Sequence, residues 1–351
     1  MVFNILKEKP DLVYKAKASL FNGLSSAEFW DPTGLVPGVD EARDKGAVVH
    51  AKYLFLKNNP GLVLKHLGLM FGVFVLLFLV FAFLGVWFVN FLLFVAFVIL
   101  VFVAIYRLNR VRREVVKLEV ADKNGFLFLA ERSPTRWQKY KALYPEVFDK
   151  GRESQRVEDC FWGSVNLNGL KTSFVSGIFY YVNVSYDNKG NRRRHPRWSN
   201  FFIAKLPSRN ESRFFLYPQS FFSKVGNFFS RKKVHTSSVD FNKAFAFKYK
   251  GKRSEKELDI VKILSPGVQE ELLKLNEHKR KSLGFFERRT SGISVLFADD
   301  SVVFFSPGSL LRKTKTNFLK SPEIKEEDLV FLKEELESMI SISNNITRYL
   351  D

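Results

Sequence analysis

Residues 67–106 form a run without a single Asp, Glu, Lys, Arg or His. A helix rises about 1.5 Å per residue, so the ~30 Å hydrocarbon core of a bilayer needs about 20 residues. The forty residues of this run are too many for one span and suit two. Because lipid offers no hydrogen-bond partners to an open backbone, both spans must be helical.

The sequence predicts a transmembrane helical hairpin within residues 61–113. Gly85 accepts the dihedral angles of a tight turn, and Trp87 favours the membrane interface, so the break between the two spans falls there. The expected helices cover about residues 67–84 and 87–106. Because the spans are short and the turn is tight, a re-entrant wedge that does not fully cross the bilayer is left open as an alternative.

One polar and two small residues add detail to this run. Asn90 is expected near the turn, where its side-chain amide can hydrogen-bond backbone groups. Gly68 and Gly72 lie four residues apart on one helix face. Small residues at this spacing let two helices approach closely, so both are candidates for helix packing.

Cations flank the apolar run on both sides and are absent from its turn. They are Lys57, Lys65 and His66 before the run, and Arg107, Arg110, Arg112, Arg113 and Lys117 after it. The positive-inside rule then places both termini in the cytoplasm and makes the chain a multi-pass protein of the cell membrane. The four arginines after Tyr106 are candidates for contact with anionic headgroups of the inner leaflet.

Composition agrees with an anionic neighbour. The formal net charge is +19, from 55 Lys and Arg against 36 Asp and Glu. Such a charge suits nucleic acid or an anionic membrane face, and the apolar run favours the membrane over nucleic acid. The single cysteine, Cys160, excludes an intrachain disulfide and a cysteine-based metal site, which is typical of a reducing compartment.

The rest of the chain predicts an α+β fold, in which the membrane hairpin is followed by a soluble domain with a mostly antiparallel sheet and packed helices. Residues 1–60 are expected to form a cytoplasmic N-terminal arm. Residues 114–150 are expected to be a helical connector, with a helix over residues 133–148 that Ser133 caps and Pro134 begins. Residues 151–351 form the soluble domain.

Short runs rich in β-formers, separated by turn residues, predict the strands of this sheet. They are Gly163–Leu167, Thr172–Val184, Ser199–Leu206 and Arg213–Tyr217, followed by a hairpin of Ile293–Phe297 with Ser301–Phe305. Ser265 and Pro266 begin a predicted helix, and Ser321 begins a long amphipathic one. Phe241 and Phe245 are expected in the core.

Three segments carry a resemblance to a known family. They read Ser-Val-Asp-Phe-Asn-Lys-Ala-Phe at 238–245, Ile-Leu-Ser-Pro-Gly-Val-Gln-Glu-Glu-Leu-Leu at 263–273, and the hairpin at 293–305. Together they resemble the prokaryotic membrane-protein family called domain of unknown function three-one-three-seven. The order of features matches over about residues 60–350. Ser265 stands where members often have Thr, and the following helix lacks their usual Met.

What the resemblance implies is architecture. Members have a hydrophobic hairpin followed by a soluble domain, and the family has no established activity to transfer to this chain. It therefore strengthens the predicted order of segments and leaves the function open.

Motifs for chemistry are missing from the sequence. There is no glycine-rich phosphate loop, no Gly-x-Ser-x-Gly turn and no His-Glu-x-x-His, and the five histidines are scattered. Asp299 and Asp300 are adjacent carboxylates, but they sit in a predicted hairpin turn, where Asp is favoured for backbone reasons. The sequence thus predicts no catalytic residue, no cofactor and no metal ligand.

Two basic segments are candidate binding surfaces. In the first, a basic loop over residues 189–197 ends at an aromatic residue, a combination that suits phosphates or headgroups. Its candidates are Arg192, Arg193, Arg194, Arg197 and Trp198. In the second, three Phe doublets spaced by seven residues precede Arg231, Lys232 and Lys233, which are further headgroup candidates. A solvated loop is the alternative for the first segment, and a strand followed by a partly buried loop is the alternative for the second.

These observations favour a membrane-anchored module on the cytoplasmic side, which binds or scaffolds by contacting an unknown protein partner or anionic lipid. An enzyme with an unrecognised site is the first alternative. A channel or transporter subunit is the second, although Asn90 is the one strongly polar side chain deep in the apolar run. A homo-oligomer is left open.

Overall fold

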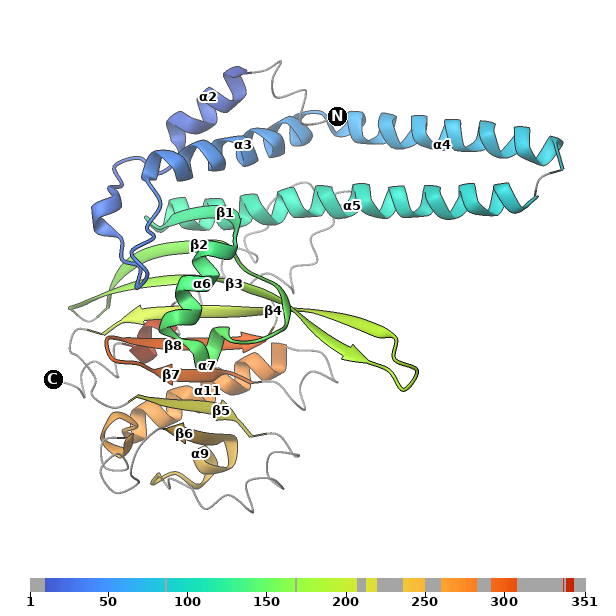
Figure 1. Cartoon of the computed structure of the whole chain (residues 1–351). Coiled ribbons are helices and arrows are strands. Elements are labelled where there is room, and N and C mark those ends of the chain that lie inside the picture. Colours follow the sequence, from blue (N-terminus) through green and yellow to red (C-terminus); the bar gives the residue numbers. More distant parts are fainter. Residues whose placement is uncertain are drawn as a thin grey trace.

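An eight-stranded, fully antiparallel sheet organises the chain in the computed structural model (Figure 1). The structure describes residues 10–85, 87–167, 169–206, 213–219, 236–249, 260–282, 292–307, 337 and 339–343. The strands are β1 (Leu127–Ser133), β2 (Glu153–Leu167), β3 (Leu170–Tyr186), β4 (Arg192–Lys205), β5 (Phe214–Pro218), β6 (Phe245–Tyr249), β7 (Ser294–Phe297) and β8 (Ser301–Pro307). Their order across the sheet is β1-β2-β3-β4-β8-β7-β5-β6.

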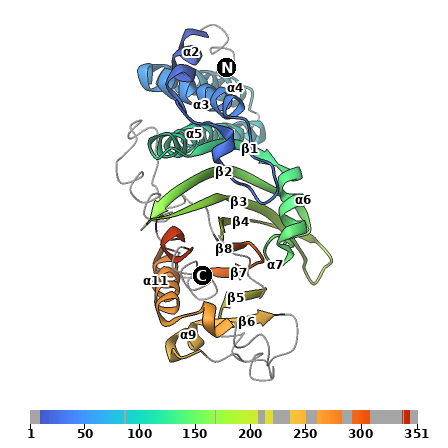
Figure 2. The same ribbon diagram turned by 90° about the vertical axis from the view of Figure 1, so that its left-hand side faces the viewer.

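Helices cover both faces of the sheet and one of its edges (Figure 2). They are α2 (Pro10–Ser19), the short 3-10 helix η1 (Ser26–Glu28), α3 (Val39–Asn58), α4 (Pro60–Phe83), α5 (Trp87–Lys123), α6 (Pro134–Leu143), α7 (Pro145–Phe148), α9 (Val239–Ala244) and α11 (Pro266–Ser282). Helices α6 and α7 lie on one face and α11 on the other. Helices α2, α3 and the C-terminal half of α5 stack beside β1. The described part of the chain is therefore α+β, as expected.

Phenylalanine rings fill the layer between the sheet and α6 and α7. Phe148 lies at its centre and contacts the rings of Tyr140, Phe179, Phe201 and Phe305, with centroids 5.2 to 6.5 Å apart. All five side chains are buried. Edge-to-face and offset pairs of this kind stabilise a core beyond the area they bury, so part of the high Phe content is explained by this layer.

Several local predictions are confirmed. The Ser133 hydroxyl caps α6 by accepting a hydrogen bond from the Arg136 N–H, and Pro134 is the first helical residue. Ser265 caps α11 in the same way through the Val268 N–H, and β7 and β8 pair as the expected hairpin. The long helix expected from Ser321 lies mostly outside the described residues, among which Met339 and Ile340 are buried.

The segment expected to be a helical connector, residues 114–150, also contains a strand. Residues 127–133 form β1, which pairs with β2 at the edge of the sheet. The cause is an apolar sequence, Phe126-Leu127-Phe128-Leu129, whose side chains are all buried. A short apolar run on both faces suits a covered strand, and here α3 and α5 provide the cover.

The segment expected to be a basic loop is a strand. Residues 192–198 form the first half of β4 and pair with β3 in unbroken register, from Tyr186 opposite Arg192 to Tyr180 opposite Trp198. All seven side chains are exposed, so no alternation of apolar and polar residues marks them as strand. Only residues 187–191 connect the strands, as the predicted turn.

Helices α4 and α5 project away from the sheet side by side (Figure 1). The turn between them includes Gly85 at φ 70°, a left-handed conformation that glycine adopts without strain. Of the residues that the structure describes, one helix, Trp87–Lys123, is long and apolar enough to cross a bilayer by length and composition. The apolar part of α4, Gly68–Phe83, is shorter than that criterion.

Candidate functional site

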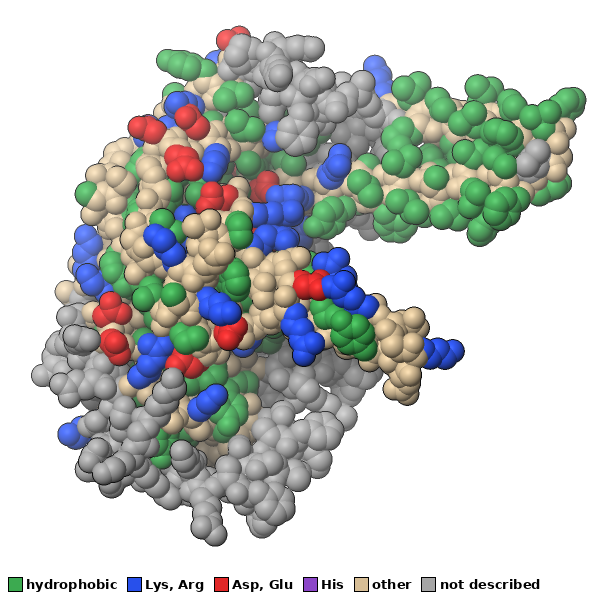
Figure 3. Space-filling view, in the orientation of Figure 1, with side chains coloured by type: hydrophobic (Ala, Val, Ile, Leu, Met, Phe, Trp, Pro, Cys, Tyr) green, Lys and Arg blue, Asp and Glu red, His purple; other side chains and the backbone are tan. Residues whose placement is uncertain are grey.

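The projecting parts of α4 and α5 expose large apolar side chains around their outer surface (Figure 3). Those exposed by half or more include Leu69, Phe71, Leu76, Leu79, Phe83, Leu84, Trp87, Phe88, Phe91, Phe94, Ile99, Phe102 and Tyr106. Only 6% of the most apolar window of α5 is buried inside the chain. A core helix of a water-soluble domain would be mostly buried, and exposed apolar surfaces of this size mark contact sites for a membrane or another protein.

The two helices contact each other through aromatic rings and one amide. Phe74 stacks on Phe97 with ring centroids 4.6 Å apart. Asn90 is buried, and its amide fits between two backbone groups of α4. With the amide oriented so that each of its atoms meets a complementary group, the Asn90 nitrogen donates to the Phe78 carbonyl at 3.1 Å, and the Asn90 oxygen accepts from the Ala82 N–H at 3.2 Å. Asn90 therefore bridges α5 and the last turns of α4, close to the turn, where the sequence places it.

The four arginines that follow Tyr106 have different surroundings. Arg107 and Arg110 are exposed, and Arg110 pairs with Glu114 at 2.7 Å. The guanidinium of Arg113 lies over the Tyr106 ring, 5.9 Å from its centre. Arg112, by contrast, is 2% exposed. The structure thus leaves Arg107, Arg110 and Arg113 accessible to headgroups and turns Arg112 into the protein.

Gly68 and Gly72 lie on an exposed part of α4. A Cβ atom built on either glycine would meet no atom within 4 Å. These glycines therefore do not mediate the contact between α4 and α5 within the chain, and their predicted role in helix packing stays a prediction.

A two-stranded ribbon, residues 183–198, extends beyond the rest of the sheet. Strand β2 begins opposite Val182 and β8 ends opposite Ser199, so past these positions β3 and β4 pair only with each other. In Figure 1 the ribbon projects from the sheet domain in the same general direction as α4 and α5. Lys and Arg side chains gather along the ribbon and beneath α5 (Figure 3).

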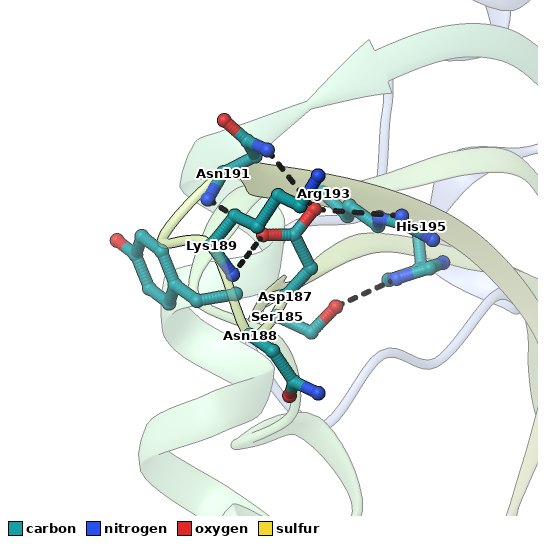
Figure 4. Close-up of a pocket in the computed structure, with 8 residues that line it drawn as sticks. Ser185, Asp187, Asn188, Lys189, Asn191, Arg193 and His195 are labelled. Carbon is teal, nitrogen blue, oxygen red and sulfur yellow. Dashed lines mark hydrogen bonds and ion pairs between the residues drawn. The ribbon is translucent and has the colours of Figure 1, made fainter.

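Asp187 organises the tip of the ribbon (Figure 4). Its carboxylate accepts hydrogen bonds from the N–H groups of Lys189 and Asn191 at 3.0 and 2.9 Å, and from the Asn191 and Arg193 side chains. These bonds, the Asn191 N–H first, lower the pKa of Asp187. The tip borders a shallow, open cavity of about 700 Å³, whose walls also include Ser185 and His195, hydrogen-bonded at 2.9 Å.

One face of the ribbon combines paired arginines with aromatic rings. Arg192 and Arg194 both form ion pairs with Glu153, at the start of β2. Farther along the same face, the Trp198 ring lies 5.2 Å from the Tyr180 ring, and Arg156 stacks on Tyr180 at 3.8 Å. The sequence predicted Arg192, Arg194 and Trp198 as candidates but gave no sign of Glu153, Tyr180 or Arg156.

A buried polar cluster around Asp31 was not predicted from the sequence. The Asp31 carboxylate is fully buried and accepts hydrogen bonds from Tyr140 and Trp162, both at 2.9 Å, and pairs with Arg136 at 3.3 Å. Burial, and then the Asp31 charge, raises the pKa of Tyr140, so its phenol stays a neutral donor. Because these partners lie more than a hundred residues from Asp31, only the local turn with Thr33 could have been read from sequence.

The Asp31 cluster ties the N-terminal arm to the sheet. The arm contains α2, η1 and α3, and Arg136 also donates to the Leu35 carbonyl at 2.6 Å. The described cavity at the ribbon tip is not lined by any residue of this cluster. Both oxygens of Asp31 are engaged, by Thr33 on one side and by Arg136, Tyr140 and Trp162 on the other, which is typical of a structural network.

The described residues show no grouping of three or more His, Cys, Asp or Glu side chains that could hold a metal ion. Cys160 is buried, and burial raises the pKa of its thiol, so it is not a reactive nucleophile. The predicted headgroup candidates Arg231, Lys232 and Lys233 lie outside the described residues.

Comparisons of the chain with protein-family models, with curated proteins and with solved structures found no match. The resemblance to domain of unknown function three-one-three-seven stays a prediction.

Proposed function

We propose that the chain is a membrane-anchored binding or scaffold module, with its sheet domain held against the cytoplasmic face of the cell membrane. In this proposal α4 and α5 form a transmembrane hairpin, and both termini lie in the cytoplasm. The sheet domain then binds an unidentified protein partner or anionic lipid beside the membrane.

The observation that carries the proposal is the exposed apolar surface of α4 and α5. A continuous apolar surface of this extent is unfavourable in water and favourable in hydrocarbon. Further support comes from the cations just beyond it. Arg107, Arg110 and Arg113 follow the apolar part of α5, whereas the turn at the other end carries no charge. The positive-inside rule matches that asymmetry to a cytoplasmic sheet domain.

Single-cysteine labelling tests this topology. The native Cys160 is buried and serves as an unreactive background. Two variants report on opposite ends of the molecule: Leu84→Cys in the turn after α4, and Asn188→Cys at the tip of the ribbon, both at exposed positions. A membrane-impermeant maleimide is added to intact cells and, separately, to permeabilised cells.

The proposal expects Leu84→Cys to react in intact cells and Asn188→Cys to react only after permeabilisation. Labelling of Asn188→Cys but not of Leu84→Cys in intact cells would reverse the orientation. Failure of both variants to react in intact cells, together with retention in carbonate-washed membranes, would replace the spanning hairpin with a re-entrant wedge. Recovery of the chain in the carbonate supernatant would refute the membrane anchor itself.

An enzyme or a transporter subunit is not proposed. Within the described residues, the cavity at the ribbon tip is open and lined by the side chains that build the turn. Among the described side chains, the contact between α4 and α5 has one that is polar and buried, Asn90, and its amide faces the backbone of α4. Neither observation favours catalysis or a polar pathway.

A further inference from the structure

The ribbon over residues 183–198 adds nothing to the core of the sheet. Residues 191–198 are all exposed, and a two-stranded ribbon gains little stability by itself in water. Its two exposed aromatic side chains, Tyr186 and Trp198, are of the kinds that favour a membrane interface. Because the ribbon projects on the same side as α4 and α5, a membrane that holds these helices faces the ribbon (Figure 1).

The ribbon presents more positive than negative charge to its surroundings. Its cations are Lys189, Arg192, Arg193, Arg194 and Arg197. The two carboxylates that approach them are Asp187, which is engaged by the turn, and Glu153, which two arginines share.

In the ion pairs with Glu153, the arginine side chains are more exposed than the carboxylate. The side chains of Arg192 and Arg194 are 51% and 57% exposed, whereas Glu153 beneath them is 27% exposed. Glu153 thus holds the two guanidinium groups side by side without covering them. Guanidinium groups offer several N–H donors in a planar arrangement that matches the oxygens of a phosphate.

We propose that this face of the ribbon, with Arg192, Arg194 and Trp198, is a docking site for the phosphate headgroups of anionic phospholipids. The proposal rests on the proposed function, since the lipid belongs to the membrane in which α4 and α5 are anchored. Arg192 and Arg194 bind headgroup phosphates, and Trp198 lies at the interface. Docking fixes the orientation of the sheet domain relative to the membrane plane.

Fluorescence quenching in nanodiscs tests this proposal on the full chain. Asn188→Cys carries a fluorophore at the ribbon tip, and a small fraction of lipid carries a nitroxide quencher on its headgroup. One set of discs contains phosphatidylcholine alone, and a second set also contains phosphatidylserine. We expect stronger quenching in the phosphatidylserine discs, and we expect high salt to abolish the difference.

The variant Arg192→Gln/Arg194→Gln should lose the effect of phosphatidylserine. Each basic residue near an anionic surface contributes enough that removing two should lower the docked-to-free ratio by on the order of tenfold. The matched control is Lys243→Gln/Lys274→Gln, which also removes two exposed cations that pair with carboxylates, on α9 and α11. The control should behave as the native chain.

The outcomes separate this proposal from the one it rests on. Equal quenching in both sets of discs, or equal losses in the ribbon variant and the control, would overturn the docking site while leaving the membrane anchor intact. Failure of the native chain to enter nanodiscs would refute the anchor first. A charge effect that the control variant shares would mean that net charge, and not the ribbon, attracts the lipid.

Discussion

Phenylalanine has opposite surroundings in two regions of this molecule. In the sheet domain Phe148 is fully buried among four other aromatic rings, whereas Phe88 at the start of α5 is 72% exposed and Phe83 at the end of α4 is 93% exposed. In the sheet domain protein shields the phenylalanine side chain from water, whereas on α4 and α5 the side chain is exposed on the outside of the protein. The difference shows that the fold of this chain covers the rings of the sheet domain and leaves those of α4 and α5 uncovered.

Replacing one phenylalanine in each region gives the largest expected contrast. Phe148→Ala should lower the free energy of unfolding by about 4 kcal/mol, because it leaves a cavity at the centre of the aromatic layer. Phe88→Ala should change it by less than about 0.5 kcal/mol, since its side chain is mostly exposed and packs against little of the protein. Chemical denaturation of the purified chain in mild detergent, followed by near-UV circular dichroism, measures both.

Equal losses in the two variants would contradict the comparison. They would mean that protein, for example another copy of the chain, covers Phe88 in solution. Detergent would then not have displaced that protein. The free energy of unfolding of Phe91→Ala, at another exposed position on α5, then tests the same surface a second time.

The tie between the N-terminal arm and the sheet gives the next largest effect. Asp31→Ala removes the acceptor of Tyr140 and Trp162 and leaves Arg136 buried beside Glu131 alone. Removing one partner of a buried ion pair costs about 3 to 5 kcal/mol. We expect a loss of about 3 kcal/mol, together with faster proteolysis of the arm before α3.

A double variant distinguishes this network from ordinary packing. Asp31→Ala combined with Arg136→Met should cost less than the sum of the two single changes, because no unpaired charge is then left inside. Additive losses would indicate that the carboxylate and the guanidinium contribute independently, and the network would have to be abandoned.

Lys150 is a charged residue in apolar surroundings at the rim of the sheet domain, and its removal should stabilise the protein. Its ammonium lies 3.9 Å from the centre of the Phe305 ring, and burial lowers the pKa of Lys150 from 10.5 to about 8. Below pH 8 the lysine is protonated in both states, so the folded state carries the whole cost of the buried charge. Between about pH 8 and 10.5 the unfolded chain binds more protons, so stability rises with pH there.

Lys150→Met should therefore raise the free energy of unfolding at pH 7 by about 1 to 2 kcal/mol, less than the full shift implies because the side chain is not fully enclosed. Its advantage over the native chain should shrink as the pH rises from 8 towards 10.5. Thermal unfolding at several pH values measures both effects. An advantage that stays constant across that window would assign the gain to added apolar contact and not to the lost charge.

Local sequence patterns predicted much of the fold, whereas the segments without such a pattern were not predicted. Ser133, Ser265 and the turn after Phe297 act through residues within four positions, so their helices and hairpin could be predicted from the sequence. The strand over residues 192–198 was missed although its partners, residues 180–186 of β3, are close in sequence, because its exposed side chains carry no apolar alternation.

The candidate site divides in the same way. Arg192, Arg194 and Trp198 are conspicuous in the sequence because basic and aromatic residues stand close together. Glu153, which holds the two arginines, lies about forty residues earlier on β2 and is visible only once β3 has brought β2 near β4. Asp31 is a more extreme case, with partners up to 131 residues away.

The smallest expected effect concerns the contact between the two projecting helices. Asn90→Leu removes the two hydrogen bonds that join the start of α5 to Phe78 and Ala82. In lipid such a side-chain contact contributes about 1 kcal/mol, which is about a fivefold change in the open fraction of the helix pair. Disulfide formation between Phe71→Cys and Phe97→Cys, whose native rings are 6.0 Å apart, reports on that fraction and should slow accordingly. Val89→Leu is the matched control, because it changes the neighbouring position without touching a hydrogen bond. An unchanged rate in Asn90→Leu would mean that these hydrogen bonds do not hold α4 against α5, and other contacts between the two helices would have to do so, since the reporter cysteines already remove the Phe71 and Phe97 rings.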